Sequence, residues 1–167
     1  MKRVAGMDRH TATGVTLIEL LVTLSVLSVL LTIGIPSLAG FVSSQKLDST
    51  VQLLKESYSQ ARYGAVTRQR SVILCPLDIG RGRCGNNWSD GVLSYLDLDG
   101  DKRYDPLQDT RLRQNEFPDG VTVDYKKRLQ IKISPKGTTG DNGTFTLTVS
   151  EEAKMLVVSA MGRIRNG

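Results

Sequence analysis

The most apolar part of the chain is residues 15–35, which contain a single charged residue, Glu19. As a helix, a run of this length extends about 32 Å, enough to cross the hydrocarbon core of a bilayer. The residues before it are polar and basic, so their end is expected to stay in the cytoplasm while the remainder of the chain is exported. The run continues through Pro36 without the small-residue cleavage site of an ordinary secretory signal. The pattern therefore predicts a membrane-spanning helix that is retained.

Beyond Pro36 the apolar positions follow a helical stripe, spaced alternately by four and three residues: Leu47, Val51, Leu54, Tyr58, Ala61 and Ala65. This spacing places them on one face of a helix. We expect one long helix over residues 16–67, apolar at first and then amphipathic, with Gly34, Pro36 and Gly40 as its weak points. A free coiled coil is the alternative for the second half, but the small alanines favour close packing on a sheet.

After Arg70 the apolar period becomes the alternation typical of strands. Pro- and Gly-containing turns such as Pro118-Asp119-Gly120 separate the segments. The predicted strands are 71–75, 91–96, 121–125, 129–133, 144–149 and 154–159, with a possible short one at 111–113. The predicted fold class is α+β: a long N-terminal helix packed on a mostly antiparallel sheet or small sandwich.

The composition adds two constraints to this picture. A length of 167 residues allows one domain with an appendage, and an aromatic content of 5% leaves the core to Val, Leu and Ile. The formal net charge is +5, and residues 121–167 hold eight basic and four acidic residues. A basic surface toward the C-terminus is therefore expected.

The two cysteines, Cys75 and Cys84, lie in a Gly-rich segment that is flexible enough to close. A disulfide here would stabilise the fold by about 2–3 kcal/mol and place the domain in an oxidising compartment. Two free thiols are the alternative. Two cysteines without a neighbouring histidine cannot hold tetrahedral zinc.

A carboxylate within an apolar run is costly unless it is paired or reaches the interface. Glu19 follows Gly14 at a short distance, in the sequence Gly14-Val15-Thr16-Leu17-Ile18-Glu19-Leu20-Leu21, and Pro36 comes later in the run. The alternative is that Glu19 only occupies the first helical turn, where the helix dipole favours a negative charge. The motif resembles the class III leader of type IV pilins and type II secretion pseudopilins.

This resemblance implies that a prepilin peptidase cuts after Gly14 and methylates Val15, which stands where the family usually has Phe. It also implies that Glu19 pairs with the terminal amine of a neighbouring subunit when the helices, with Pro36, assemble into a filament. The only histidine, His10, lies in the leader. The mature chain would then lack the imidazole of a Ser–His or Cys–His site. We therefore expect no enzyme, no cofactor and no small-molecule substrate.

The head sequence is similar to the GspH- and FimT/FimU-type minor pilins in three stretches. These are Cys75-Pro76 through Cys84, Asn87-Trp88-Ser89-Asp90-Gly91, and Asp97-Leu98-Asp99-Gly100-Asp101. We expect Trp88 to pack in the core. The acidic stretch lacks the glycine and glutamate of an EF-hand loop, because Lys102 and Gln108 occupy their places. A solvated turn is favoured over calcium, and no metal site is predicted.

The chain ends in Gly162-Arg163-Ile164-Arg165-Asn166-Gly167, a polar tail expected to be mobile. In an extended chain Arg163 and Arg165 project to the same side, about 6.6–7 Å apart, close to the spacing of successive phosphates on a nucleic-acid strand. The pattern is similar to the G-R-x-R motif of FimT-type pilins, which bind DNA during natural transformation. The alternative is a solvated basic tail.

Together these patterns predict a leader at 1–14, a transmembrane and assembly helix at 15–41 and a periplasmic head at 42–167. The resemblance implies a single-pass inner-membrane subunit that later enters a pilus or pseudopilus with other pilins. The favoured function is a minor pilin of a type IV pilus that binds DNA non-specifically through Gly162, Arg163 and Arg165. The alternative is a structural, GspH-like pseudopilin of a type II secretion system.

Overall fold

The computed structural model describes residues 14–125 and 129–167. The predicted leader, apart from Gly14, and the side chain of Pro36 lie outside the described residues. The chain divides into two compact units, Met1–Gly40 and Phe41–Gly167, and the helix α1, Leu17–Arg68, contributes to both. The single helix expected over residues 16–67 is confirmed to within a residue at each end.

In the first unit, α1 begins at a cap formed by Thr16. The Thr16 hydroxyl accepts a hydrogen bond from the amide of Glu19 at 3.3 Å, and its carbonyl accepts one from Leu20 at 3.1 Å. Further along, the hydroxyls of Thr23, Ser25 and Ser28 donate to carbonyls one turn earlier. These hydroxyls are thus satisfied within the helix itself. Within the residues that the structure describes, no helix combines the length and the apolar character that crossing a membrane requires.

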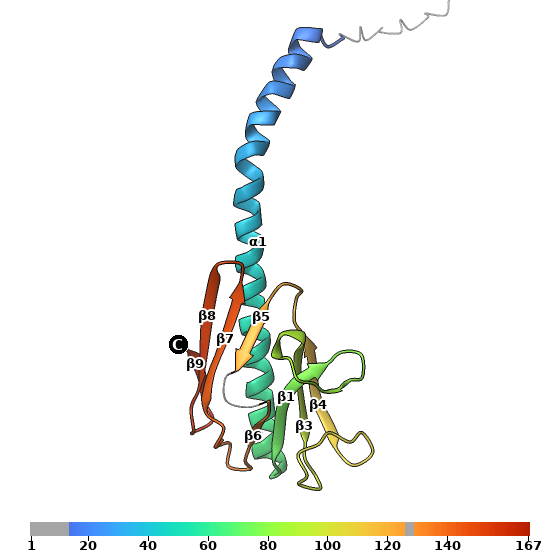
Figure 1. The fold of residues 1–167 in the computed structure, drawn as a ribbon, viewed down its shortest axis with the longest axis vertical. Coiled ribbons are helices and arrows are strands. Elements are labelled where there is room, and N and C mark those ends of the chain that lie inside the picture. Colours follow the sequence, from blue (N-terminus) through green and yellow to red (C-terminus); the bar gives the residue numbers. More distant parts are fainter. Residues whose placement is uncertain (1–13, 126–128) are drawn as a thin grey trace, which may run out of the picture. The chain divides into compact units, whose positions relative to one another are not determined.

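The second unit packs the C-terminal half of α1 on two antiparallel sheets (Figure 1). The first sheet has the order β2-β1-β3-β4, with β6 also paired to β1. Its strands are β1 (Val72–Asp78), β2 (Arg83–Cys84), β3 (Gly91–Leu96), β4 (Thr110–Glu116) and β6 (Ile131–Ile133). The second sheet has the order β5-β7-β8-β9, formed by β5 (Thr122–Tyr125), β7 (Gly143–Val149), β8 (Glu152–Val158) and β9 (Ile164–Asn166). A short 3-10 helix, η1 (Trp88–Asp90), precedes β3.

The predicted stripe of α1 forms the centre of the core. All six of its residues are buried, and they pack with the inward residues of both sheets, such as Leu74 of β1 and Phe145 of β7. Trp88 is 4% exposed and meets Phe145 edge-to-face with ring centroids 5.1 Å apart, which confirms its assignment to the core. The stripe therefore serves sheet packing, not a free coiled coil.

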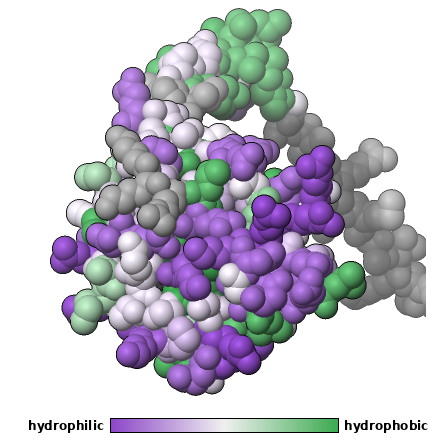
Figure 2. Space-filling view, turned by 60° about the horizontal axis from the view of Figure 1, so that its bottom comes forward, coloured by the Kyte–Doolittle hydropathy of each residue, from purple (hydrophilic) through white to green (hydrophobic). Residues whose placement is uncertain are grey.

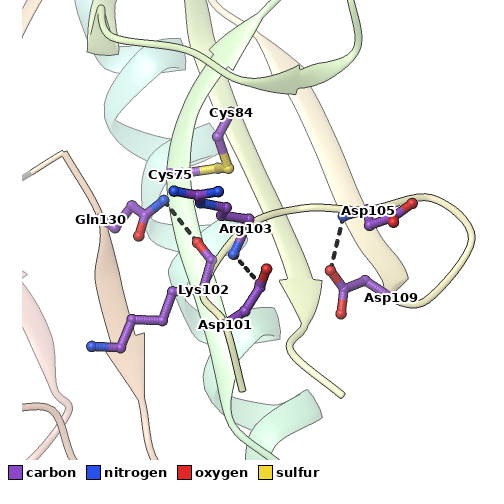
Figure 3. The surroundings of a disulfide bond; sticks show 8 residues. All are labelled: Cys75, Cys84, Asp101, Lys102, Arg103, Asp105, Asp109 and Gln130. Atoms are coloured by element: carbon purple, nitrogen blue, oxygen red, sulfur yellow. Dashed lines mark hydrogen bonds between the residues drawn. A yellow bond between two sulfur atoms is a disulfide. The ribbon is translucent and has the colours of Figure 1, made fainter. Parts of the chain in front are cut away.

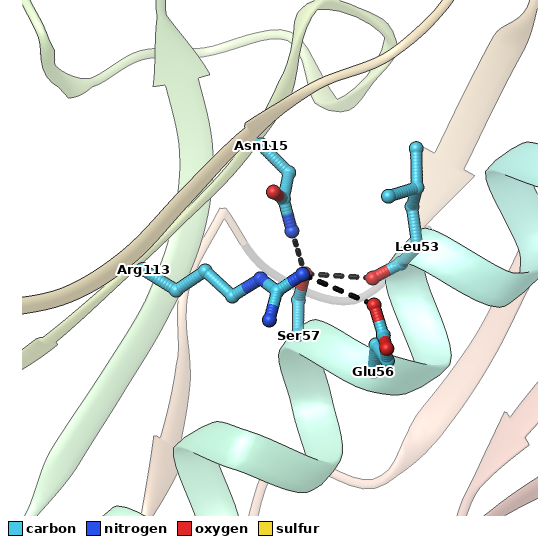
Figure 4. Close-up of polar contacts among 5 residues, drawn as sticks. All are labelled: Leu53, Glu56, Ser57, Arg113 and Asn115. Atoms are coloured by element: carbon cyan, nitrogen blue, oxygen red, sulfur yellow. Dashed lines mark hydrogen bonds and ion pairs between the residues drawn. The ribbon is translucent and has the colours of Figure 1, made fainter.

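Polar contacts fix the edge strand β4 to α1 (Figure 4). Arg113 forms a 3.0 Å ion pair with Glu56, and the amide group of Asn115 lies 2.7 Å from the Ser57 hydroxyl. Ser57 itself donates to the carbonyl of Leu53, so its hydroxyl joins the helix to the strand. Residues 111–113, predicted as a short strand, belong to the longer strand Thr110–Glu116 because it pairs with β3 along its length, from Gly91 with Glu116 to Leu96 with Thr110.

Two strands were missed by the sequence prediction, β2 and β9. Both are short, with two and three residues, and neither shows an apolar alternation. The expectation of a mobile tail is wrong, because Ile164 to Asn166 pair with Leu156 to Val158 of β8. The partly buried Ile164 packs against the core and holds the strand in place.

Candidate functional site

The tail reaches its position through a tight turn between β8 and β9. The amide of Gly162 donates to the carbonyl of Ser159 at 2.8 Å, and the amide of Arg163 donates to the Ser159 hydroxyl at 3.1 Å. The carbonyl of Arg163 in turn accepts from the amide of Ser159 at 2.9 Å. These bonds make the end of the chain the second arm of a hairpin.

Gly162 is the residue on which this turn depends. Its φ of +70° lies in the left-handed region, and a Cβ there would stand 1.8 Å from the carbonyl oxygen of Gly137. The same Gly137 carbonyl accepts a hydrogen bond from Nε of Arg62 at 3.0 Å. The β8–β9 turn, the Gly137 turn and α1 therefore meet at one point.

Arg163 and Arg165 are exposed on either side of the half-buried Ile164. Arg165 lies opposite Val157 in the pairing of β9 with β8. Arg165 and Ile164 are neighbours on β9, so their side chains project to opposite faces of the sheet. Arg163 precedes β9 in the turn and lines a groove together with Ile164. The side-by-side placement expected for an extended tail stays a prediction.

A groove of about 470 Å³ runs between β9 and α1 and adds residues that the sequence analysis did not find. Arg62 and Arg163 both line it, as does Tyr63, whose ring is 72% exposed. Lys136 is exposed in the turn that ends at Gly137. Neither Arg62 nor Lys136 belongs to a sequence motif. Arg62 is associated with the tail by its hydrogen bond to the Gly137 carbonyl, and Lys136 is the residue that precedes Gly137.

Other cations considered for this surface have different surroundings. Lys154 forms an ion pair with Asp48 on α1. Arg68 and Arg70 are exposed near the end of α1, and within the described part of the chain they make no hydrogen bond or ion pair with the tail. The candidate cations near the β8–β9 turn are therefore Arg62 and Arg163 in the groove, and Lys136 and Arg165 at exposed positions. We call these four residues the tail patch.

The predicted processing and assembly residues lie at the start of α1. Gly14 and Val15 are exposed, and Val15 is 72% accessible to solvent. Glu19 is exposed in the first turn of the helix, where its charge faces the positive end of the helix dipole. Large apolar side chains surround it, among them Leu17 at 77% and Ile18 at 70% exposure. An apolar surface of this kind needs a partner.

The head has a different surface. The face of the head unit seen in Figure 2 is mostly hydrophilic, with apolar side chains only at scattered positions. Cys75 and Cys84 form the predicted disulfide between β1 and β2, with their Cα atoms 5.6 Å apart. Cys75 is fully buried in a small cluster with Ile73, Leu93 and Tyr95, on the face of the sheet that turns away from α1.

Comparisons with known proteins agree on one family. The family described as type II transport protein GspH matches residues 50–162, more than half of the chain, and the prokaryotic N-terminal methylation motif matches residues 9–35. The pilin-like protein PilA1 of Thermus thermophilus is 29% identical over 164 residues, which cover 93% of this chain and 98% of PilA1.

Solved structures agree in fold. Two crystal forms of the type IV minor pilin FimU from Pseudomonas aeruginosa PAO1 superpose with TM-scores of 0.58 and 0.57, at 18% and 20% identity. They cover 76% and 72% of this chain, and 92% of FimU in both cases.

Proposed function

This chain belongs to the GspH family of type IV pilin-like proteins and pseudopilins, and from that premise we propose that it is a minor pilin whose tail patch binds DNA without sequence preference. Members of this family are structural subunits that assemble with other pilins. The proposal adds a ligand to that structural role. DNA captured by a pilus subunit would serve natural transformation.

The observation that carries the proposal is the ordering of Gly162, Arg163 and Arg165 by the β8–β9 hairpin. Arg165 lies on β9 and Arg163 is the residue just before that strand. Two residues of extended chain span about 7 Å, a spacing that suits neighbouring phosphates of one nucleic-acid strand. Because the backbone that carries them is already paired, binding would not have to order it. Arg62 and Lys136 extend the positive surface, and the exposed ring of Tyr63 offers a stacking face for an unpaired base.

The magnitude of such binding is modest for one subunit. Two or three phosphate contacts give an affinity that falls about 12- to 40-fold when the salt concentration rises fourfold. Several subunits, or repeated contacts along one DNA molecule, would raise the effective affinity without new chemistry. Weak and salt-sensitive binding by each head is therefore compatible with capture of long DNA.

The test is a salt titration of DNA binding with the full-length protein in detergent. Replacing Arg163 and Arg165 by Gln should make the slope of log Kobs against log salt shallower by about 1.8, because two phosphate contacts are lost. The matched control is Arg81→Gln with Arg83→Gln, which removes the same charge with the same spacing from the β1–β2 hairpin. Equal slopes for the two double variants would rule out the tail patch.

We further propose that the prepilin peptidase cuts after Gly14 and methylates Val15, and that residues 15–41 hold the chain in the inner membrane with its head in the periplasm. Support comes from the match to the methylation motif and from the apolar side chains around Glu19. Glu19 would meet the terminal amine of a neighbouring subunit. The disulfide is consistent with an oxidising compartment on the far side of the membrane.

A second candidate function is that of a structural pseudopilin in type II secretion, because the matching family is described as type II transport protein GspH. The two functions predict different losses in a strain that lacks the protein. Loss of DNA uptake with normal secretion of exported proteins would support the pilin. Loss of secretion with normal uptake would support the pseudopilin.

A further inference from the structure

Three carboxylates meet where β3 and β4 join. Leu96 and Thr110 are paired at the base of this hairpin, so Asp97 and Asp109, the next residues on each side, stand opposite one another. Asp99 folds back toward them, and one carboxylate oxygen of each residue lies within 4.8 Å of the others. Asp97 is 4% exposed and Asp109 is 8% exposed, while Asp99 faces solvent. We call these three residues the hairpin-base cluster.

Such burial is costly for carboxylates without a cation. Charges of the same sign at this spacing repel, and each buried carboxylate also loses its hydration. In the described part of the chain no Lys or Arg forms an ion pair with any member of the cluster. Backbone amides supply part of the compensation: Leu98 and Asp105 donate to the two oxygens of Asp109 at 3.1 and 3.0 Å.

Asp97 is only half satisfied by this arrangement. Its Oδ1 accepts hydrogen bonds from the amides of Gly100 at 3.1 Å and Lys102 at 3.3 Å. Its Oδ2 is buried and has no hydrogen-bond partner among the described residues. A buried carboxylate oxygen of this kind requires a donor or a cation.

Tyr95 gives a second, independent indication at the same place. It lies on β3, which ends at Leu96, and Asp97 follows two residues after it, so the alternation of the extended chain directs both side chains to the same face. Tyr95 is fully buried, and its hydroxyl has no hydrogen-bond partner among the described residues. The hydroxyl is therefore a buried hydrogen-bond donor without a partner, next to the end of β3 where the acidic loop begins.

We propose that the hairpin-base cluster binds one calcium ion, with Asp97, Asp99 and Asp109 as its protein ligands. Calcium takes six to eight oxygen ligands in a flexible geometry, so three carboxylates with water at the exposed Asp99 side form a suitable set. Oδ2 of Asp97 would gain the cation, and the Tyr95 hydroxyl would donate to a ligand oxygen. From the sequence alone we expected a solvated turn here, but in the structure Asp97 and Asp109 are buried.

The loop differs from an EF-hand because its ligands come from the two ends of a hairpin. Figure 3 shows Arg103, a residue of the β3–β4 loop, beside the Cys75–Cys84 disulfide. Tyr104 packs against the same cluster as the disulfide, and Gln130 donates to the carbonyl of Lys102 at 3.1 Å. Calcium would therefore hold the β3–β4 loop against the outer face of the first sheet.

The experiment is isothermal titration of the metal-free full-length protein in detergent with calcium chloride. We expect one ion per chain with half-saturation at about 10⁻⁴–10⁻³ M, the range of extracellular calcium modules. Calcium at tenfold above half-saturation should also raise the unfolding midpoint of the head by about 4–7 °C. Magnesium should produce a smaller shift, because it demands a stricter octahedral geometry.

Asp99→Asn is the test variant, because Asn keeps the side-chain oxygen that accepts from the Asp101 amide while it removes the charge. It should weaken calcium binding at least tenfold. The matched control is Asp124→Asn, the same change at an exposed position on β5, which should bind as the wild type does. Equal calcium binding by Asp99→Asn and wild type would overturn the proposal. Equal shifts of the unfolding midpoint with magnesium and with calcium would also overturn it. The same holds if calcium shows no saturable binding up to concentrations about tenfold above the expected range.

Discussion

The backbone at Gly162 determines how the C-terminal tail is held. Gly162 stands in the left-handed region and lies against the Gly137 carbonyl, which also receives the Arg62 side chain. The glycine of the G-R-x-R pattern therefore has a structural explanation independent of any ligand. It turns β8 back into β9, with Arg163 in the turn and Arg165 on the strand.

Gly162→Ala should destabilise the head by more than about 2 kcal/mol, because it adds a left-handed alanine to a steric clash with backbone. The measurement is the denaturant midpoint followed by fluorescence of Trp88, the only tryptophan of the chain, which is buried in the head core. Gly140→Ala is the control, since a Cβ there meets nothing within 4 Å. Its midpoint should stay near that of the wild type. Similar losses in both variants would contradict this account of Gly162.

At the scale of elements, the strands β1 and β2 of the first sheet differ in how many contacts hold them. β1 is buried on both faces, with Val72 and Leu74 toward α1 and Ile73 and Cys75 toward the outer cluster. Its partner β2 is joined to it by only two residue pairs, Leu77 with Cys84 and Asp78 with Arg83. So short a hairpin contributes little by itself, and the disulfide is its main constraint.

Replacing Cys75 and Cys84 by Ala should lower the free energy of unfolding by about 2–3 kcal/mol, because the open loop gains entropy in the unfolded chain. The Trp88 denaturation curve measures this loss. Reductant should lower the midpoint of the wild type and leave that of the double variant unchanged. An unchanged stability after both substitutions would show that packing alone holds β2.

At the scale of the whole molecule, the two units have opposite surfaces. In the head, the apolar core residues are buried between the two sheets and α1. In the first unit, long apolar side chains such as Leu17, Ile18 and Leu30 are exposed. Exposed apolar surface with an acidic residue at its start suits burial among identical or related helices. Under the proposed function, the assembled filament is the environment that would bury these side chains.

Glu19→Ala should reduce incorporation of the chain into filaments at least tenfold. Without the Glu19 carboxylate, the terminal amine of a neighbouring subunit would be an unpaired charge among apolar helices. Quantitative blotting of sheared filaments against the membrane pool measures this ratio. Glu151→Ala, an equivalent change at an exposed head position, is the control. Mass spectrometry should find both variants processed to Val15. Undiminished incorporation of Glu19→Ala would remove the basis for its assembly role.

The sequence by itself determined the features that rest on local periodicity. The spacing of Leu47, Val51 and Leu54 predicted both the helix and its buried face, because every fourth or third side chain must point the same way. Alternation likewise located the longer strands, and the short loop between Cys75 and Cys84 indicated a disulfide that the structure confirms. Gly14 and Glu19, near one another in the chain, were recognisable as a motif without any fold.

Only the tertiary structure decided the features that join distant residues. β9 exists because β8 offers it a partner, so three residues with only one apolar side chain, Ile164, become a strand. Arg62 approaches the tail through the carbonyl of Gly137, across 75 positions of the chain. Asp97 and Asp109 meet because the pairing of β3 with β4 brings the two ends of their loop together. Local periodicity carries no information about such contacts, because they depend on which strands pair and in which register.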